Sequence, residues 1–542
     1  METKIFHPEQ DKNAVAEAAA ILRRGGLLGI PTETVYGLGA DALNEDAVRR
    51  IFEAKGRPQD NPLIIHVPSA DWLERYCQNV PPAAYRLAER FWPGPLTMIL
   101  PRRDIVPLRT TGGLETVGVR CPNHPVTLAI IEAAGVPVAA PSGNTSGRPS
   151  PTTAQHMMED MMGRIDGIVD GGPCAVGVES TIIDLTVQPP RLLRPGGLPL
   201  EALEQVLGEV AVDDAVRRKM GEGERPRAPG MKYRHYAPKA AVTVVTGPAR
   251  RSAAYIREHL PQGAGVICFD EYAPQFTGHI VHRLGSVDDK LAQAQHVFDA
   301  LRTFDDTDVT EIYAQCPDES GLGLAVSNRL KKAAGFHVVD VLPLVIGFTG
   351  PTGAGKTSAL RALERLGGLV LDCDAVYHEL LRTDEALRGA IADAFGPVFG
   401  ADGTLDRQKL GTAVFGDPAA MERLNAIIFD RLPRELLRRI NDSDAPLIGI
   451  DAINLVESGL SRLCRRTVAV LAPAETRVRR IMARDGIPED YARLRVQAQK
   501  PDDFYRAHCT DVLVNDAAAP DAFETIAYQR LQHIFEEETD HE

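Results

Sequence analysis

The feature that most limits what this chain can fold into is a glycine-rich loop deep inside it. Residues 350–357 read Gly-Pro-Thr-Gly-Ala-Gly-Lys-Thr and fit the phosphate-binding pattern Gly-x-x-x-x-Gly-Lys-[Ser/Thr]. Such a loop joins the first strand of a domain to its first helix, and here 341–348 predict the strand and 358–366 the helix. A domain therefore opens near residue 344, behind a large and different first part. We interpret the chain as a fusion of two nucleotide-using parts.

The composition is that of an ordinary globular protein. With 542 residues, 44% hydrophobic and 25% charged, three or four domains are expected. The net charge of -14 argues against a membrane-surface protein and against stable, direct nucleic-acid binding. The eight cysteines are scattered and no two form a Cys-x-x-Cys pair. A cytoplasmic location is therefore expected, because a disulfide framework or thiolate zinc site is not predicted. We find no signal peptide and no run long enough to span a membrane.

The order of patterns along the chain predicts an α/β multidomain protein. Helical apolar spacing at 13–24 ends at two glycines and is followed by a short strand at 27–30. Strands and helices alternate to about residue 210, and a polar Gly- and Pro-rich stretch at 221–230 reads as a linker. The predicted parts are 1–215, a linker or lid at 216–239, a small α/β domain at 240–343, and a nucleotide-binding domain at 344–542.

Several loops of the first part are rich in hydroxyl groups, glycines and cations. Small hydroxyl residues and exposed backbone N–H groups bind anions, and arginine grips a carboxylate or phosphate with two bonds. Taken singly, each such loop reads equally well as an ordinary turn or a solvated pair of charges. No Ser-His-Asp or paired-carboxylate arrangement stands out beside them. The loops lie at 31–39, 55–63, 141–147, 179–181 and 194–197, with Arg120 at the end of an apolar strand.

Together and in this order, these segments resemble the threonylcarbamoyl-AMP synthase family, with its YrdC-type domain. The resemblance covers residues 1 to about 343, and the segments 229–238 and 321–330 belong to the longer, two-domain form of the family. The family joins L-threonine, bicarbonate and ATP into threonylcarbamoyl-adenylate, releases pyrophosphate, and thereby supplies the t6A modification of tRNA. The resemblance implies a twisted mixed sheet with helices, followed by a small Rossmann-like domain, and the downstream t6A transferase machinery as a partner. No tightly bound organic cofactor is expected.

The resemblance also implies site residues. In the family the linker folds over the active site, so Tyr236 would act as part of a lid. Taken alone, Tyr236 reads equally as a packed linker aromatic and His66 as a structural histidine of an apolar strand. Positions that hold threonine correspond to Thr32, His66, Arg120, Ser142 and Ser180. Positions near ATP correspond to Lys55, Thr116, Asn144, Ser150, Arg194 and Tyr236, with Arg57 and Asn61 as supporting members.

Two other functions are open for the first part. One is an RNA-binding module, but the sequence lacks the interleaved aromatic residues and basic stripe that RNA stacking needs. The other is a carbamoyltransferase of the hydrogenase-maturation type. Those proteins carry Cys-x-x-Cys zinc fingers, which this chain does not have.

The loop at 350–357 predicts how the second part binds ATP. Backbone N–H groups of the loop and of the helix that follows cradle the phosphates. Lys356 would reach the β- and γ-phosphates, and Thr357 would be a ligand of Mg²⁺. The residues expected at ATP are Gly350, Gly353, Ala354, Gly355, Lys356, Thr357 and Ser358.

The segments after this loop resemble dephospho-CoA kinase over nearly all of 344–530, which implies a parallel sheet with a helical lid. They include 372–378 after a second strand, 451–460 after a third, and 480–486. That family phosphorylates the 3′-hydroxyl of dephospho-CoA with ATP and Mg²⁺. The implied roles are a general base for Asp374, acceptor contacts for Asp372, Asp374 and His378, and a charge-neutralising lid cation for Arg484, which Arg480 would assist.

Some residues of the second part depart from that family. A His-Pro pair expected near Phe429 is missing, 452–457 differ from the usual Pro-Leu-Leu-Phe-Glu, and Pro351-Thr352 replace Gly-Ile. A kinase with another small-molecule acceptor, or a nucleotide-sensing regulatory domain, therefore stays open. The retained Lys356, Asp374 and Arg484 argue against the regulatory reading. Without the resemblance, Asp372 and Asp374 also read as helix caps.

Overall fold

The computed structural model describes residues 2–218, 226–229, 231, 236–400, 404–414, 417–517 and 519–539. Most of the predicted linker, including 219–225, 230 and 232–235, lies outside the described residues. The chain divides into two compact units, Met1–Val341 and Leu342–Glu542. The α/β multidomain class is confirmed, whereas the finer division into four parts stays a prediction.

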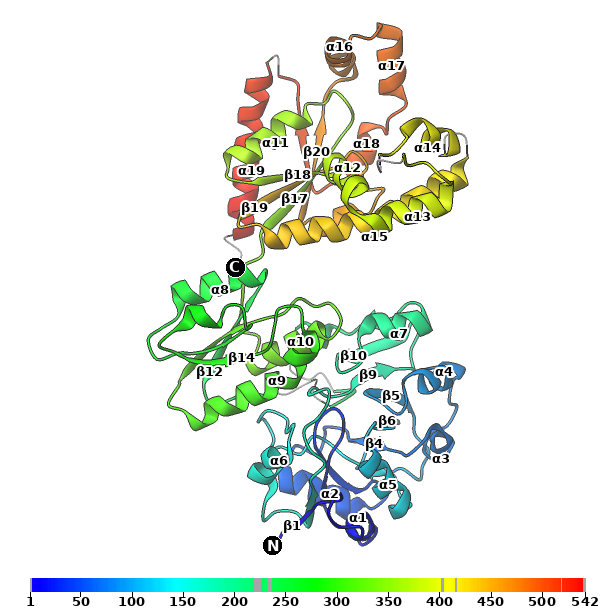
Figure 1. Cartoon of the computed structure of the whole chain (residues 1–542), viewed down its shortest axis with the longest axis vertical. Coiled ribbons are helices and arrows are strands. Elements are labelled where there is room, and N and C mark those ends of the chain that lie inside the picture. The colour runs from blue at the N-terminus through cyan, green and yellow to red at the C-terminus, as the bar shows by residue number, and fades with distance from the viewer. Residues whose placement is uncertain are drawn as a thin grey trace. The chain divides into compact units, whose positions relative to one another are not determined.

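The first unit opens with a mixed sheet of eleven strands, as predicted (Figure 1). Parallel and antiparallel pairs alternate irregularly across it: β2 is antiparallel to β3, for example, whereas β4 is parallel to β6. In spatial order the strands are β1 (Lys4–Phe6), β8 (Gly167–Val169), β2 (Leu28–Ile30), β3 (Gly37–Asp41), β7 (Val138–Ala139), β4 (Ile64–His66), β6 (Thr116–Arg120), β5 (Leu96–Pro101), β9 (Thr181–Asp184), β10 (Arg191–Arg194) and β11 (Ala211–Val212).

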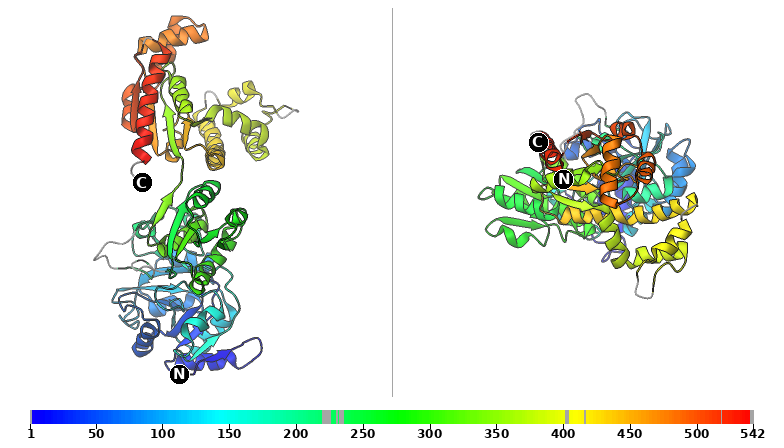
Figure 2. Two further views of the ribbon diagram at one scale, coloured as in Figure 1. Left: turned by 90° about the vertical axis from the view of Figure 1, so that its left-hand side faces the viewer. Right: turned by 90° about the horizontal axis from the view of Figure 1, so that it is seen from above.

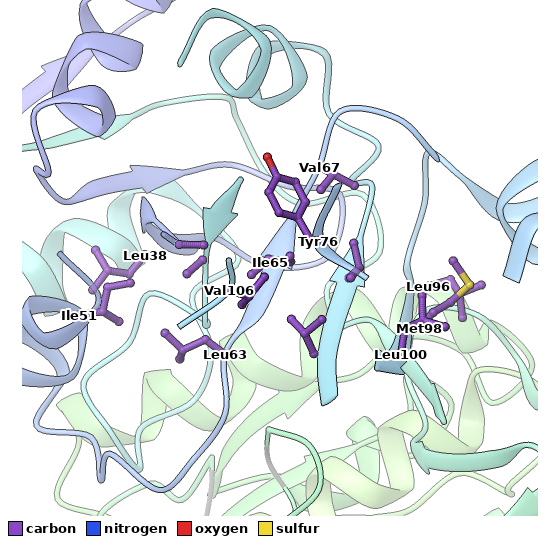
Figure 3. Close-up of a cluster of buried hydrophobic side chains, with 14 of the residues drawn as sticks. Leu38, Ile51, Leu63, Ile65, Val67, Tyr76, Leu96, Met98, Leu100 and Val106 are labelled. Atoms are coloured by element: carbon purple, nitrogen blue, oxygen red, sulfur yellow. The ribbon is translucent and has the colours of Figure 1, made fainter. Parts of the chain in front are cut away.

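The period of two along these strands separates core from site. Ile65 of β4 and the residues that flank the strand, Leu63 and Val67, alternate along the chain and pack into the same apolar cluster as Met98 of β5 (Figure 3). The intervening residues of β4 therefore point to the other face, where His66 lies. The helices of this region are α1 (Ala14–Arg23), α2 (Glu45–Lys55), α3 (Leu73–Tyr76), α4 (Pro82–Phe91), α5 (Pro125–Ala134), α6 (Ala154–Met161) and α7 (Leu200–Leu207).

A second, fully parallel sheet completes the first unit. Its order is β14 (Ile280–Arg283), β13 (Gly265–Cys268), β15 (Glu311–Gln315), β12 (Ala241–Thr246) and β16 (Val338–Asp340). Its helices are α8 (Ala249–His259), α9 (Lys290–Thr303) and α10 (Gly323–Ala333). Val35 and Val178 from the first sheet's loops join the core under α9 and α10. The α/β structure predicted after residue 240 is thus present, and it shares buried contacts with the loops of the first sheet.

The second unit is a five-stranded parallel sheet covered by helices, as predicted for a phosphate-binding-loop kinase. Its order is β18 (Leu369–Asp372), β19 (Leu447–Asp451), β17 (Leu344–Thr349), β20 (Arg466–Leu471) and β21 (Asp511–Val514). The predicted strand at 341–348 begins only at Leu344, after Pro343. The predicted helix at 358–366 begins at Lys356, because Gly355 caps it with a φ of 102°.

The helices of the second unit place a lid at one end of its sheet. The C-terminal helix α19 lies along α11, the helix after the phosphate-binding loop (Figure 2), and α16 and α17 project from the sheet (Figure 1). Within the described residues no helix is both long and apolar enough to cross a membrane. The helices are α11 (Lys356–Arg365), α12 (Cys373–Thr383), α13 (Glu385–Phe395), α14 (Arg407–Val414), α15 (Pro418–Asp442), α16 (Ala474–Asp485), α17 (Glu489–Gln497), α18 (Asp502–His508) and α19 (Pro520–Thr539). Short 3-10 helices span Ala70–Trp72, Asp214–Val216, Ala273–Phe276, Phe304–Asp306 and Leu460–Leu463.

Candidate active sites

A pocket in the first unit gathers most of the residues predicted to bind threonine and ATP. It lies where the polar ends of β4, β6 and β10 meet the loops after β7 and before β9. Of the predicted residues it is lined by His66, Arg120, Ser142, Ser180, Lys55, Arg57, Asn144, Arg194 and Tyr236. Other lining residues include Thr34, Val35, Ser146, Gly147, Glu179 and Pro229.

Arg120, the last residue of β6, places a guanidinium group in the pocket. Strand register places it opposite His66, the last residue of the parallel β4. Its Nη2 lies 2.7 Å from Oε2 of Glu33, and both side chains are buried. A carboxylate of the protein thus occupies Arg120 in this structure, where a threonine carboxylate was predicted. Burial, followed by the nearby Arg120 charge, lowers the pKa of His66 to about 3, so the imidazole is neutral at pH 7.

Lys55 holds the loop after β7 in place. It is the last residue of α2, which ends at Gly56 with a φ of 62°, and its side chain is buried. Its Nζ donates to the backbone carbonyls of Ser142 and Asn144. Burial lowers its pKa well below the ordinary value. Ser142 in turn donates to Oδ1 of Asn144 at 2.6 Å, so the loop presents a fixed set of polar atoms to the pocket.

Glu179 lies at the centre of a buried polar cluster on the opposite wall. Its Oε1 accepts from Oγ of Ser150 at 2.6 Å, and its Oε2 accepts from Nε of Arg329 at 2.7 Å. Burial opposes ionisation, but the charges of Arg329 and Arg194 outweigh it and lower the pKa of Glu179 to about 2. Arg194 donates to the carbonyl of Ser180 at 3.0–3.1 Å. This wall therefore carries one carboxylate and two guanidinium groups.

Tyr236 is packed as the structural interpretation of this residue expects, whereas its role in a lid stays a prediction. It lines the pocket, and its ring packs against Phe298 of α9 with centroids 5.0 Å apart. Its φ of 65° lies in the left-handed region, which a tyrosine adopts at a cost. Burial, with the Glu179 charge next, raises its pKa to about 12. Tyr236 is thus a buried residue that also faces the candidate site.

Four predicted residues, Thr32, Asn61, Thr116 and Ser150, lie outside the pocket lining. Oγ1 of Thr32 donates to the carbonyl of Val35 at 2.7 Å, which shapes the turn before β3. Ser150 reaches the site through Glu179. Asn61 is buried, and Thr116 opens β6. Ligand contacts stay a prediction for these four residues, as they do for the residues that line the pocket.

The sequence interpretation missed Glu33, Glu179 and Arg329 as functional partners. All three were inside segments that had been noted, but nothing local says that a charge will be buried. The available signal was the charge of Arg329 between the apolar residues 324–326 and Leu330, since a charge there needs a partner once the helix packs.

The second unit has a pocket of about 230 Å³ around the phosphate-binding loop. All of 350–357 lines it, with Ile453, Arg480 and Arg484 among the other lining residues. A side chain at Gly355 would be strained, because φ is 102° there and a Cβ would come within 2.1 Å of Nδ2 of Asn515. Arg480 donates to the carbonyls of Gly353 and Ala354 at 3.3 Å and so supports the loop from the lid side. Ser358 follows in the first turn of α11 and does not line the pocket.

Lys356 is paired with an acidic residue at the end of a neighbouring strand. Its Nζ lies 2.5 Å from Oδ1 of Asp451, the last residue of β19. Asp451 lies opposite Asp372 in the parallel pair of β19 and β18. Burial raises the pKa of Asp451, and the nearby charge of Lys356 partly offsets this increase. The structure therefore assembles a cation and carboxylates at the carboxyl end of the sheet, where ligands of such folds bind.

The two aspartates of 372–374 have different local roles. Asp372 is the N-cap of α12: its side chain accepts from the backbone N–H groups of Asp374 at 2.9 Å and Ala375 at 3.1 Å. Asp374 lies in the first helical turn with an exposed side chain, and His378 is exposed one turn later. The helix-cap interpretation therefore holds for Asp372, whereas Asp374 presents its carboxylate to solvent.

Arg484 lines the pocket at the end of α16. Its guanidinium pairs with Asp485 at 2.7 Å and its side chain is 60% exposed. Thr357, the predicted Mg²⁺ ligand, lies beside Lys356 in the same pocket. Among the residues that the structure describes, no group of three or more His, Cys, Asp or Glu side chains is arranged to hold a metal ion. Hydroxyl and carboxylate oxygens are nevertheless the donors that Mg²⁺ takes beside phosphates.

The chain matches three family models in order. The model described as telomere recombination (Sua5_yciO_yrdC) matches residues 20–196, and the C-terminal domain of threonylcarbamoyl-AMP synthase matches 198–335. The threonylcarbamoyl-AMP synthase of Pyrococcus abyssi is 51% identical over 330 residues, 60% of this chain and 95% of that protein. This chain belongs to the threonylcarbamoyl-AMP synthase family. The enzyme of the same name from Bacillus subtilis is 47% identical over 328 residues, 60% of this chain and 94% of that protein.

Solved structures agree with this assignment. The structure of P. abyssi Sua5 complexed with L-threonine has a TM-score of 0.58 and 48% identity, covering 63% of this chain and all of that one. The dephospho-CoA kinase model matches residues 344–521. The chain is therefore a threonylcarbamoyl-AMP synthase fused to a dephospho-CoA kinase domain, and both families use ATP.

Proposed function

We propose that the pocket around Arg120 and Arg194 makes L-threonylcarbamoyl-adenylate from L-threonine, bicarbonate and ATP. The observation that carries this proposal is that residues from seven separate segments, predicted for two different ligands, line one pocket. Threonine's amine would take up carbon dioxide to form a carbamate, whose oxygen attacks the α-phosphorus of ATP and displaces pyrophosphate. Such a reaction depends mainly on holding two anionic reactants in line.

The pocket residues suit that task without acid–base chemistry of their own. Arg120 offers a buried guanidinium for the threonine carboxylate, in exchange for Glu33. His66, neutral at pH 7, adds no competing charge beside it. Asn144 and Arg194 face the same cavity and are the candidates for the nucleotide side, whereas Ser142 is a candidate for the threonine side. Tyr236 would close the linker over the bound reactants.

The test of this proposal uses the full chain. Pyrophosphate release from ATP is measured with threonine and bicarbonate, and with each omitted. We expect release only when both are present. Equal release without threonine would reject the assignment of this pocket, while the kinase activity of the same preparation reports that the chain is intact.

For the second unit we propose transfer of the γ-phosphoryl group of ATP to the 3′-hydroxyl of dephospho-CoA. Backbone N–H groups of 350–357 and the positive N-terminal end of α11 would hold the phosphates. Lys356 would leave Asp451 for the β- and γ-phosphates, and Thr357 would hold the Mg²⁺ that accompanies ATP and neutralises phosphate charge. Asp374 would accept the hydroxyl proton, and Arg484 would move from Asp485 to the transferring group.

Fewer structural features support the identity of the phosphoryl acceptor than support the binding of ATP. Asp372, Asp374 and His378 lie on α12 or at its start, and Ile453, from the segment that departs from the family pattern, is 50% exposed and lines the pocket. Phe429 lies in α15, and its side chain is outside those described. Phosphorylation of dephospho-CoA is compared with that of other nucleosides by the full chain. Transfer to another nucleoside in preference to dephospho-CoA would reject the proposed acceptor.

We also propose a cytoplasmic enzyme that passes its adenylate to the machinery for t6A in tRNA. All eight cysteines are free thiols, as expected where thiols are kept reduced.

A further inference from the structure

Helix α10 of the small sheet contains an arginine that the proposed chemistry has not used. Ser327, Asn328 and Arg329 interrupt an otherwise apolar stretch, and the Arg329 side chain is completely buried. A charged side chain inside a protein is costly unless every donor is matched. Its partners therefore show what the burial of Arg329 achieves.

All three nitrogen atoms of Arg329 donate hydrogen bonds. Nε donates to Oε2 of Glu179 at 2.7 Å, and Nη2 donates to the carbonyl of Pro195 at 2.9 Å. Nη1 donates to Oδ1 of its neighbour Asn328 at 2.8 Å, and Asn328 in turn donates to the carbonyl of Val216 at 2.8 Å. Two of these three bonds reach residues of the first sheet's loops. The guanidinium is thus fixed in one orientation.

One of those long-range partners lines the candidate synthase site, and the other is the chain neighbour of a lining residue. Glu179 lines the pocket, and its other oxygen holds Ser150. Pro195 follows Arg194, whose guanidinium also lines the pocket. The Arg329 guanidinium also lies 5.5 Å from the centre of the Tyr236 ring. Arg329 of α10 therefore contacts Glu179 and Tyr236, and it bonds to the neighbour of Arg194; these three residues line the pocket.

We infer that Arg329 is a positioning residue of the synthase reaction, through which the small α/β domain completes the synthase pocket. It neutralises and orients Glu179, so that the neighbouring Arg194 stays available to an anionic reactant instead of being drawn into a pair with that carboxylate. Arg329 does not touch the pocket itself; it acts through Glu179, Pro195 and Tyr236. The inference rests on the proposed synthase function.

The chain offers a matched control for this inference. Arg302 of α9 is also buried and also crosses from the small sheet to the first, where it pairs with Asp160 and donates to the carbonyl of Pro149 at 2.7 Å. Neither Arg302 nor Asp160 lines the pocket. Arg302→Met therefore removes a buried cation from the same contact, and the partners of this cation, Asp160 and Pro149, do not line the pocket.

The experiment compares full-length Arg329→Met, Arg329→Lys and Arg302→Met in threonine-dependent pyrophosphate release, with kcat and KM determined for both threonine and ATP. We expect Arg329→Met to lower kcat/KM by about 10–100-fold, as misplacement of reacting groups does. Arg329→Lys should restore part of the loss by keeping the charge. Arg302→Met should change thermal stability but lower kcat/KM far less.

A second pair of variants separates positioning from folding. Glu179→Gln should lower kcat/KM, and adding Arg329→Met to it should cost little more, because both changes disrupt the same wall. The inference is overturned if Arg329→Met equals the parent chain, if Arg302→Met is equally damaging, or if the Glu179 and Arg329 effects simply add. Absence of threonine-dependent release in the unmutated chain would instead overturn the proposed synthase function.

Discussion

Asp374 is the residue at which the structure most sharply separates catalysis from folding. Asp372 accepts two backbone N–H bonds as the N-cap of α12, while Asp374 lies exposed in the first turn. The two carboxylates are two positions apart, so a change at one is a natural control for the other. We predict that Asp374→Asn removes the base for the acceptor hydroxyl and leaves the fold intact.

The expected loss of kcat and the expected loss of stability differ enough to distinguish a catalytic from a structural role. Losing a general base lowers kcat by about 10²–10⁴, which corresponds to roughly 2.7–5.5 kcal/mol of activation free energy. The stability cost of Asp374→Asn is limited to the charge–dipole interaction of an exposed first-turn carboxylate, about 0.3–1 kcal/mol. At Asp372 the order reverses. Asp372→Ala loses the cap and costs about 0.5–2 kcal/mol of stability, whereas Asp372→Asn keeps an equally good cap.

The assay measures ATP-dependent phosphorylation of dephospho-CoA by the full chain, together with the thermal unfolding temperature. Synthase activity of each variant, measured in the same preparation, confirms that the chain is otherwise unchanged. If Asp374→Asn keeps full kinase turnover, Asp374 is not the base. If Asp372→Asn lowers turnover as much as Asp374→Asn does, the assignment of separate roles is wrong.

Three further predictions follow from buried or paired charges. Arg120→Ala should destabilise the first unit by about 3–5 kcal/mol, because Glu33 is left buried and unpaired. Adding Glu33→Gln should recover stability in thermal unfolding but not threonine affinity in titration, and recovery of both would make Arg120 structural. Burial of neutral His66 lowers its pKa to about 3 in the folded protein, whereas an unfolded histidine takes up a proton below about pH 6.5. The free energy of unfolding should therefore be unaffected by this group above pH 6.5 and should fall toward pH 3, by up to about 1.4 kcal/mol per pH unit. Unfolding temperatures of His66→Gln should therefore fall less than those of the parent between pH 7 and pH 4.5, and parallel curves would refute this. Lys356→Ala should abolish most kinase turnover and leave pyrophosphate release by the synthase unchanged, since Lys356 pairs within the second unit; a loss of both activities would contradict separate sites.

Local sequence patterns predicted several strands and most of the loops that line the two pockets. Apolar runs located β4, β6, β17 and β19, and turn residues after them located the loops that line both pockets. The phosphate-binding loop was found from its spacing alone, because glycines with positive φ and a helix N-terminus are properties of neighbouring residues. Boundaries shifted by a few residues where a proline or a glycine cap decided the first turn.

What the sequence could not show is which charges meet across the fold. Glu33 and Arg120 are 87 positions apart, and Glu179 and Arg329 are 150 apart. Such pairs depend on strand order and on how the small sheet packs, neither of which has a local signature. The same limit explains why the pairing of Arg120 with Glu33 was not predicted.

The hydrophobic cores indicate that each of the two units has its own source of stability. The apolar clusters of the first unit contain residues up to Val341, and those of the second begin at Leu344. Since burial of apolar area is the dominant stabilising contribution, each unit stabilises its own fold. Arg329 adds a contrast within the first unit, where the core under α10 includes residues of the first sheet's loops and a buried cation crosses to the pocket wall. The small sheet and its helices therefore contact the wall of the synthase pocket directly.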